Sequence, residues 1–116
     1  MSQGAALLLT IVLELMAAAC WWRIHPAPQV ALKRLMLVTV TVSLITHPFA
    51  WWANYTLVGV FTRWTRVGLI ELGVVVVEGA LFFYLVPMLA RRAFPLAFLT
   101  NATSFGVGLI ILAWLR

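Results

Sequence analysis

Four long hydrophobic segments dominate the pattern of the chain, with short polar stretches between them. They run from Ala5 to Trp22, from Ala31 to Ala53, from Val67 to Ala90 and from Phe94 to Leu115. Each is close to the ~20 residues that a helix needs to cross a bilayer. Backbone groups in lipid must be paired within their own segment, so each segment is predicted to be a transmembrane α-helix. The pattern predicts an all-α polytopic membrane protein with a single domain over residues 1–116.

The connections between these segments are short and carry helix-breaking or charged residues. Pro26 and Pro28 follow the first segment, and residues 54–66 form the middle loop. Arg91-Arg92 and Pro95 are predicted to mark a tight third turn. Short loops make successive helices antiparallel neighbours, so the four helices are expected to form a bundle.

The composition makes the lipid bilayer the solvent of this protein. The chain has 116 residues, of which 65% are hydrophobic and 9% are charged. A soluble domain of this length could not bury so much apolar surface. The net charge is +5, but the basic residues are spread over the helix ends, which argues against a nucleic-acid-binding face. The lone Cys20 excludes an intrachain disulfide.

The positive charges predict an orientation. Five basic residues flank the first and third loops and three lie at the opposite side: Arg23, Lys33, Arg34, Arg91 and Arg92 against Arg63, Arg66 and Arg116. The positive-inside rule then places loops one and three in the cytoplasm and both termini outside. The bias is modest, which leaves dual topology open. All six tryptophans lie near predicted helix ends, where interfacial anchoring is the expected role.

The two halves of the chain resemble each other. Leu13-Glu14 sits in the first segment much as Val77-Glu78 sits in the third, and each acid is followed by a basic pair, Lys33-Arg34 or Arg91-Arg92. Aligning the two pairs brings Ser43 onto Asn101 and Thr46 onto Ser104. This predicts a duplicated helical hairpin, residues 1–54 and 64–116, with parallel repeats related by a pseudo-twofold axis along the membrane normal. Chance similarity between apolar segments is the alternative.

All three acidic residues lie inside predicted membrane helices. They are Glu14, Glu71 and Glu78. A carboxylate in hydrocarbon costs roughly 3 kcal/mol on insertion scales, and neither solubility nor loop charge requires it there. Intramembrane ionisable residues therefore indicate a functional site.

Polar partners for two of these acids are predicted near the bilayer centre. At a rise of ~1.5 Å per residue, Glu14 and Glu78 reach a depth similar to that of four residues in the second and fourth segments. These four are Ser43, Thr46, Asn101 and Ser104. Together the six form a candidate ion- or substrate-binding site, and two central carboxyls that share one proton could exchange it for a cationic solute. The alternative is that both glutamates are protonated packing contacts, worth about 0.6 kcal/mol each on average.

A second polar layer is predicted nearer the outside. Glu71 lies two helical turns before Glu78, and His47 falls near the same depth, so the two are expected to form an access path. Alternatively, Glu71 pairs with Arg66 or Arg63 at the interface. For His47, the alternative is that it caps carbonyl groups that the following proline frees from the helix.

No catalytic residues, cofactor or metal are predicted. His47, Glu71 and Glu78 match no metalloprotease spacing, and haem would require a second embedded histidine on a facing helix. The sequence has no nucleophile triad and no nucleotide-binding motif. The protein is therefore not expected to be an enzyme.

Two resemblances accompany these residues. Four helices in this length, with Glu14 alone in the first, resemble the plan of the small multidrug resistance transporters, whose proton- and drug-binding glutamate would fall at this position. That family's residues around the glutamate and its Gly-rich third helix are absent here. The whole set resembles a group of small uncharacterised bacterial integral membrane proteins: Leu13-Glu14, Thr46-His47-Pro48, Glu71-x6-Glu78-Gly79 and Asn101-x-x-Ser104-Phe105-x-x-Gly108. This resemblance implies a bacterial inner-membrane protein and no particular activity.

Two functions agree with this pattern. The first is a small transporter or channel, coupled to protons or cations, with Glu14 and Glu78 as the exchanging groups. The second is a non-catalytic membrane subunit or scaffold whose polar residues fix helix packing or bind a partner. A four-helix monomer has little room for a wide pathway, so a homo-oligomer or a partner membrane subunit is expected.

Overall fold

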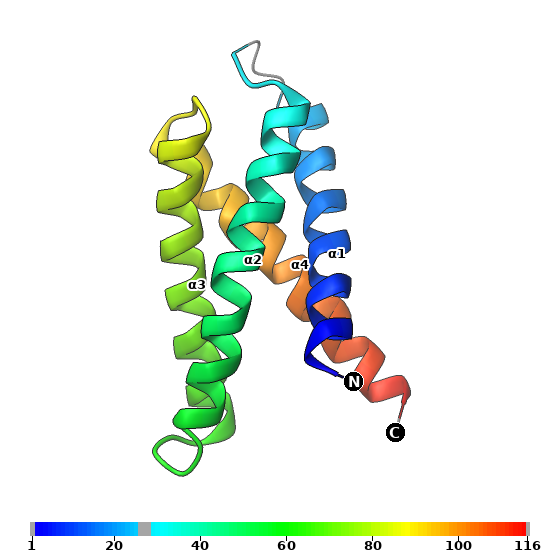
Figure 1. Cartoon of the computed structure of the whole chain (residues 1–116), viewed down its shortest axis with the longest axis vertical. Helices are drawn as coiled ribbons and strands as arrows, with labels where there is room; N and C mark the ends of the chain where they lie inside the picture. The colour runs from blue at the N-terminus through cyan, green and yellow to red at the C-terminus, as the bar shows by residue number, and fades with distance from the viewer. Residues whose placement is uncertain (1, 26–28, 116) are drawn as a thin grey trace.

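The computed structural model describes residues 2–25 and 29–115, and over these residues the chain forms four α-helices. They are α1 (Gln3–Ile24), α2 (Leu32–Thr56), α3 (Arg63–Leu85) and α4 (Ala90–Trp114), shown in Figure 1. Each helix is long and apolar enough to cross a membrane. The predicted all-α, four-helix membrane fold is confirmed.

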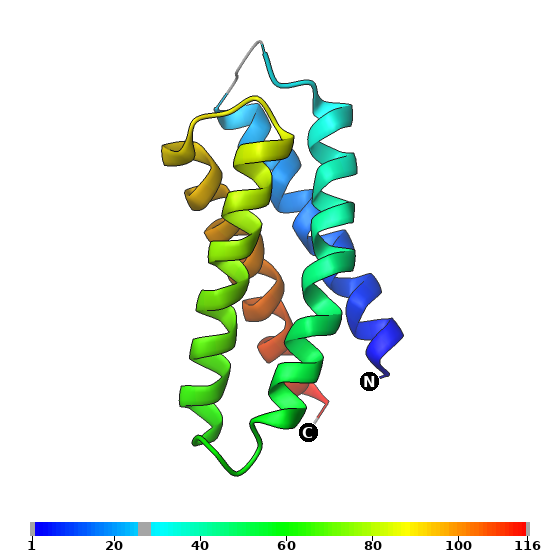
Figure 2. The same ribbon diagram turned by 60° about the vertical axis from the view of Figure 1, so that its left-hand side comes forward.

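The helices form a ring in chain order. Each packs against its two neighbours in sequence, and α1 closes the ring by packing against α4. Figures 1 and 2 show the α1–α2 and α3–α4 connections at one end of the bundle, with the α2–α3 loop and the chain termini at the other. We call these the double-loop end and the terminal end. The bundle is 46 Å long, which suits a hydrocarbon core of ~30 Å with its interfaces.

Polar caps begin the two odd-numbered helices at the terminal end. The Ser2 hydroxyl accepts a hydrogen bond from the Ala5 amide at 3.2 Å and so caps α1. Thr62 caps α3 in the same way, which starts that helix at Arg63, inside the predicted middle loop. Gly59 has φ +86°, a backbone conformation that a side chain would disfavour, and it turns the chain between α2 and α3.

The turn between α3 and α4 differs from the prediction. Val86 is extended and precedes Pro87, and a residue before proline is disfavoured in helical conformation. α3 therefore ends there, and α4 begins at Ala90 with the arginine pair in its first turn. Pro95 lies inside α4, where it removes one backbone hydrogen bond without ending the helix. The assignment of Pro95 to the turn was wrong, since Pro87 is the residue that breaks the helix.

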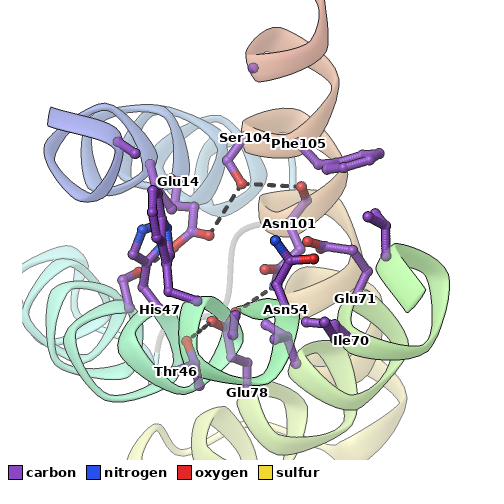
Figure 3. A pocket seen from close by; sticks show the side chains of 18 of the residues that line it. Glu14, Thr46, His47, Asn54, Ile70, Glu71, Glu78, Asn101, Ser104 and Phe105 are labelled. Atoms are coloured by element: carbon purple, nitrogen blue, oxygen red, sulfur yellow. Dashed lines mark hydrogen bonds between the residues drawn. The ribbon is translucent and has the colours of Figure 1, made fainter. Parts of the chain in front are cut away.

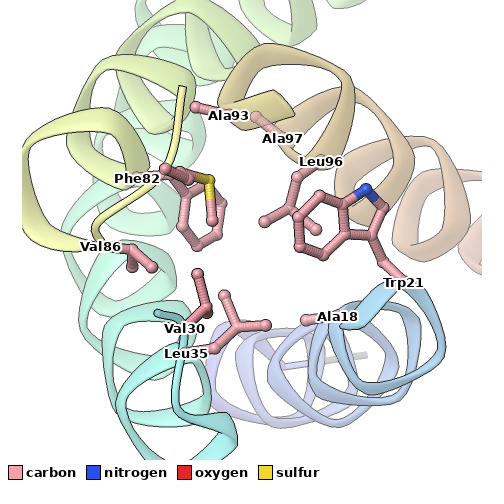
Figure 4. Close-up of a cluster of buried hydrophobic side chains, with 10 residues drawn as sticks. Ala18, Trp21, Val30, Leu35, Phe82, Val86, Ala93, Leu96 and Ala97 are labelled. Atoms are coloured by element: carbon pink, nitrogen blue, oxygen red, sulfur yellow. The ribbon is translucent and has the colours of Figure 1, made fainter. Parts of the chain in front are cut away.

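Buried hydrophobic side chains gather at the double-loop end and fill the space between all four helices (Figure 4). We call this cluster the apolar plug; its members are Ala18, Trp21, Val30, Leu35, Phe82, Val86, Met88, Ala93, Leu96 and Ala97. Phe82, Leu35 and Leu96 are its largest fully buried side chains. Trp21 is only 5% exposed, so the prediction that every tryptophan anchors the membrane interface is wrong for this residue.

The second and fourth helices correspond to each other in detail. Both have 25 residues, and the register that aligns the two basic pairs also aligns the starts of the helices. The same register pairs four buried positions: Leu35 with Ala93, Thr39 with Ala97, Val42 with Thr100, and Ser43 with Asn101. A duplicated hairpin would produce this correspondence; the duplication itself stays a prediction.

Candidate functional site

The two central glutamates occupy the middle of the bundle. Glu14 on α1 and Glu78 on α3 are each 2% exposed. Ser43, Thr46 and Asn101 are buried as well, and Ser104 is half-buried. The six residues that the sequence singles out as a binding site therefore lie together, between the apolar plug and the terminal end.

Glu14 accepts hydrogen bonds from both even-numbered helices. The Ser43 hydroxyl on α2 donates to Glu14 Oε2, and the Ser104 hydroxyl on α4 donates to Oε1 at 3.3 Å. Each carboxyl oxygen thus has its own donor. The Glu14 side chain links three helices at one point.

Glu78 is held in the same manner. Thr46 Oγ1 donates to Glu78 Oε1 at 2.5 Å, and Asn101 Nδ2 donates to Oε2 at 2.5 Å. The second N–H of Asn101 bonds the Ala97 carbonyl at 2.8 Å, so both amide hydrogens have acceptors. Figure 3 shows the labelled side chains of this site directed into the space between the helices.

The four contacts form a symmetric pattern. One carboxyl hydrogen bond crosses each of the four helix interfaces in the ring. Each glutamate takes its first donor from its own hairpin, Ser43 or Asn101, and its second from the other hairpin, Ser104 or Thr46. The second donor lies three residues after the position that corresponds to the first. A pseudo-twofold axis through the centre would relate the two halves of this network.

The three hydroxyls of the network each have a second acceptor. Ser43 Oγ lies 2.9 Å from the Thr39 carbonyl, and Thr46 Oγ1 lies 3.0 Å from the Val42 carbonyl. Ser104 Oγ lies 3.1 Å from the Asn101 carbonyl. A hydroxyl has a single hydrogen to donate, so it can bond the carboxylate or the backbone at any one time. The network therefore accommodates two hydrogen-bond arrangements.

A cavity of about 360 Å³ extends from these residues toward the terminal end. The six site residues form its inner end, and the terminal halves of all four helices line its walls. Among the wall residues are Thr10, Ile70, Val74, Phe105 and Gly108. The apolar plug lies on the other side of the glutamates, so the space is open at one end of the bundle and filled at the other.

The predicted access residues both line this cavity. Glu71 and His47 lie nearer the terminal end than the two central glutamates. Arg66 Nε donates to Asn54 Oδ1 at 2.8 Å, and no hydrogen bond joins it to Glu71 among the described residues. Of the residues that the structure places around this cavity, none is a lysine or an arginine. The alternative in which Glu71 pairs with Arg66 or Arg63 is therefore not supported.

His47 has an unpaired nitrogen. Its Nε2 atom is buried, and no described residue supplies a hydrogen-bond partner. Its ring lies 6.1 Å from the ring of Trp51, centroid to centroid. An unpaired Nε2 does not fit the alternative in which this histidine caps freed carbonyl groups. Within residues 2–25 and 29–115, no group of three His, Cys, Asp or Glu side chains is positioned to hold a metal ion.

Two residues at the mouth of the cavity escaped prediction from the sequence. Trp51 and Asn54 line the cavity one and two turns beyond His47. Helical spacing was the signal that could have found them, because positions four and seven residues after His47 share its face.

Comparisons with protein-family models, with curated proteins and with solved structures give no match for this chain. The two resemblances drawn from the sequence stay predictions.

Proposed function

We propose that this protein is a small membrane transporter that exchanges protons for a cationic solute, with Glu14 and Glu78 as the exchanging groups. The observation that carries the proposal is the position of these carboxyls at the inner end of a cavity whose described lining includes no lysine or arginine. A solute that enters from the terminal end meets both of them before the apolar plug. Intramembrane carboxyls in such positions commonly mark proton relays and ion pathways.

The hydrogen-bond network supports exchange because it suits both states of the carboxyls. When Glu14 is ionised, Ser43 and Ser104 donate to it. When Glu14 is protonated, its O–H can donate to Ser43, which then donates to the Thr39 carbonyl 2.9 Å away. Neither state leaves a buried donor without an acceptor, so a proton can leave and return at little structural cost.

The geometry also favours one alternative function. Both glutamates bond two other helices, which is what packing contacts in a non-catalytic subunit or scaffold would do. The two functions differ in what they require of the carboxyl group. Glutamine has nearly the same shape and can bond the same neighbours, but it cannot release a proton. A packing contact would tolerate glutamine, whereas an exchange site would not.

The test is proton release from the purified protein in weakly buffered detergent when cations are added. The wild type should release protons on adding a cation that it binds. The double variant Glu14→Gln/Glu78→Gln should fold, elute as the wild type does, and release none. Thr103→Val is a matched control, because the Thr103 hydroxyl bonds only the Leu99 carbonyl of its own helix.

Two results would contradict the proposal. One is a folded wild type that releases no protons with either metal ions or organic amines. The other is release that persists in the double glutamine variant, because the protons would then come from elsewhere.

The surroundings proposed for this activity follow from the charge pattern. We place the protein in a bacterial plasma membrane, with the double-loop end in the cytoplasm and the cavity facing outward. The narrow bundle favours function as a homo-oligomer or with a partner subunit. A catalytic activity is not proposed.

A further inference from the structure

The cavity has carboxyl groups at two depths. Their arrangement indicates the class of solute, an inference that rests on the proposed function. We propose that the exchanged solute is a linear aliphatic diamine. One ammonium group binds between Glu14 and Glu78, and the other binds at Glu71. The two levels, the wall between them and the unpaired His47 nitrogen support this assignment.

The charge of the cavity fits a dication better than a monocation. Three carboxyl groups line it, and no lysine or arginine among its described lining offsets them. The central pair is already bonded by side-chain donors, whereas Glu71 has no hydrogen-bond donor among the described residues. A single ammonium at the inner end would leave Glu71 without a cation. A second ammonium would supply one.

The distance between the central glutamates and Glu71 suits a diamine with a short spacer. Glu71 and Glu78 are seven residues apart on α3, which separates their backbones by ~10 Å at 1.5 Å per residue. Two ammonium–carboxylate hydrogen bonds of about 2.8 Å take up part of that length. The remainder corresponds to a spacer of a few methylene groups.

The wall between the levels is mostly apolar. Ile70, Val74 and Phe105 line it, together with Gly108, and the Thr10 hydroxyl is a polar exception. A polymethylene spacer can pack against such a surface, whereas the hydration shell of a metal ion cannot. With a volume of about 360 Å³, the cavity is also large for one ion.

His47 provides an independent sign of a ligand. Its Nε2 atom is buried and unpaired among the described residues, on a side chain that lines the cavity near its mouth. In the neutral tautomer with its hydrogen on Nδ1, Nε2 accepts a hydrogen bond, and an ammonium group has three hydrogens to donate. An ammonium at the Glu71 level would pair with the carboxylate and give this nitrogen its missing donor.

Calorimetry on the purified full chain, with proton release recorded in parallel, tests the inference. The probes are 1,3-diaminopropane and n-propylamine, which share a carbon chain and differ by one ammonium group. 1,3-Diaminopropane should bind about 10- to 100-fold more tightly, as a second charged hydrogen bond predicts. Glu71→Gln should bring the affinity for 1,3-diaminopropane down to that for n-propylamine. A series of diamines on the wild type should show an optimum length, and this measurement does not depend on how the variant folds.

The outcomes separate the two proposals. Equal affinity for both amines, with proton release that Glu14→Gln/Glu78→Gln abolishes, would overturn the diamine and leave proton–cation exchange standing. A preference for 1,3-diaminopropane that survives in folded Glu71→Gln would overturn the placement at two levels, as would affinity that rises with length without an optimum. No release with any amine or metal ion would overturn both proposals.

Discussion

Gly79 should be the least replaceable glycine in the bundle, because α4 lies directly against it. A Cβ atom built on Gly79 would lie 2.3, 2.6 and 2.9 Å from three ring carbons of Phe94. Real side chains essentially never approach so closely, so the ring of Phe94, which is 38% exposed, has to move away from α3. Overpacking of this kind costs typically 1–3 kcal/mol, so Gly79→Ala should lower the unfolding free energy by about that amount.

Gly73 on the same helix is the matched control. Its Cβ would meet no atom within 4 Å, so Gly73→Ala should be neutral or stabilising by up to about 1 kcal/mol, as the helix propensities predict. The assay is thermal or denaturant unfolding in detergent, with both variants and the wild type measured side by side. The difference in unfolding free energy between the two variants should be visible in the same experiment.

A double mutant identifies the cause of the stability loss in Gly79→Ala. If the ring of Phe94 is the obstacle, Phe94→Ala should recover much of the stability lost in Gly79→Ala, because the two changes are coupled. Gly79 also follows Glu78, whose bond to Asn101 spans α3 and α4, so forcing these helices apart should weaken that contact as well. Equal stability of Gly79→Ala and Gly73→Ala, or strictly additive losses in the double mutant, would refute the reasoning.

Two further predictions address the site and its surroundings. Thr46→Val removes a donor to Glu78 and should lower the unfolding free energy by about 0.6–1.7 kcal/mol, the range for interhelical hydrogen bonds in membranes. Thr41→Val is the control and should change it by less than about 0.5 kcal/mol, because the exposed Thr41 hydroxyl bonds only its own helix. Equal losses of unfolding free energy would contradict the network. In a Cys20→Ser background, Thr10→Cys in the cavity wall should react with a water-soluble thiol reagent and Leu96→Cys in the apolar plug should not. Equal labelling of the two, measured by mass shift, would mean that the plug does not seal the bundle.

The cost of polar groups in lipid explains why the proximity of the six central residues could be predicted from the sequence. Carboxyls in an apolar segment need donors from neighbouring helices, and few buried residues could supply them. Depth alone then matched Glu14 and Glu78 with serine, threonine and asparagine on α2 and α4, and the structure brings these groups into hydrogen-bond contact. Depth could not show which donor bonds which glutamate, because the pairing depends on which helices are adjacent in the ring.

Helix faces explain the errors. Trp21 was expected at the interface because it lies near a helix end, but it is seven residues after Glu14 and so shares the inward face. The turn was assigned to Pro95 because two arginines precede it, but Pro95 lies in the second turn of α4, where it removes one backbone hydrogen bond without ending the helix. The end at which the cavity opens could not be read from hydropathy, since the plug and the cavity walls are both largely apolar.

The apolar plug constrains how the proposed exchange would cross the membrane. In transporters with inverted repeats, exchanging the conformations of the two repeats moves the opening to the opposite side. The two hairpins proposed here run in parallel, so the same exchange would leave the opening at the terminal end. The second opening then has to come from repacking of Leu35, Phe82 and Leu96. Moving bare carboxylates past such side chains is costly, whereas protonated or cation-paired carboxyls would meet a smaller penalty. The plug would thus repack only when the carboxyls are protonated or paired with the solute. This condition couples the transport of the solute to that of the proton.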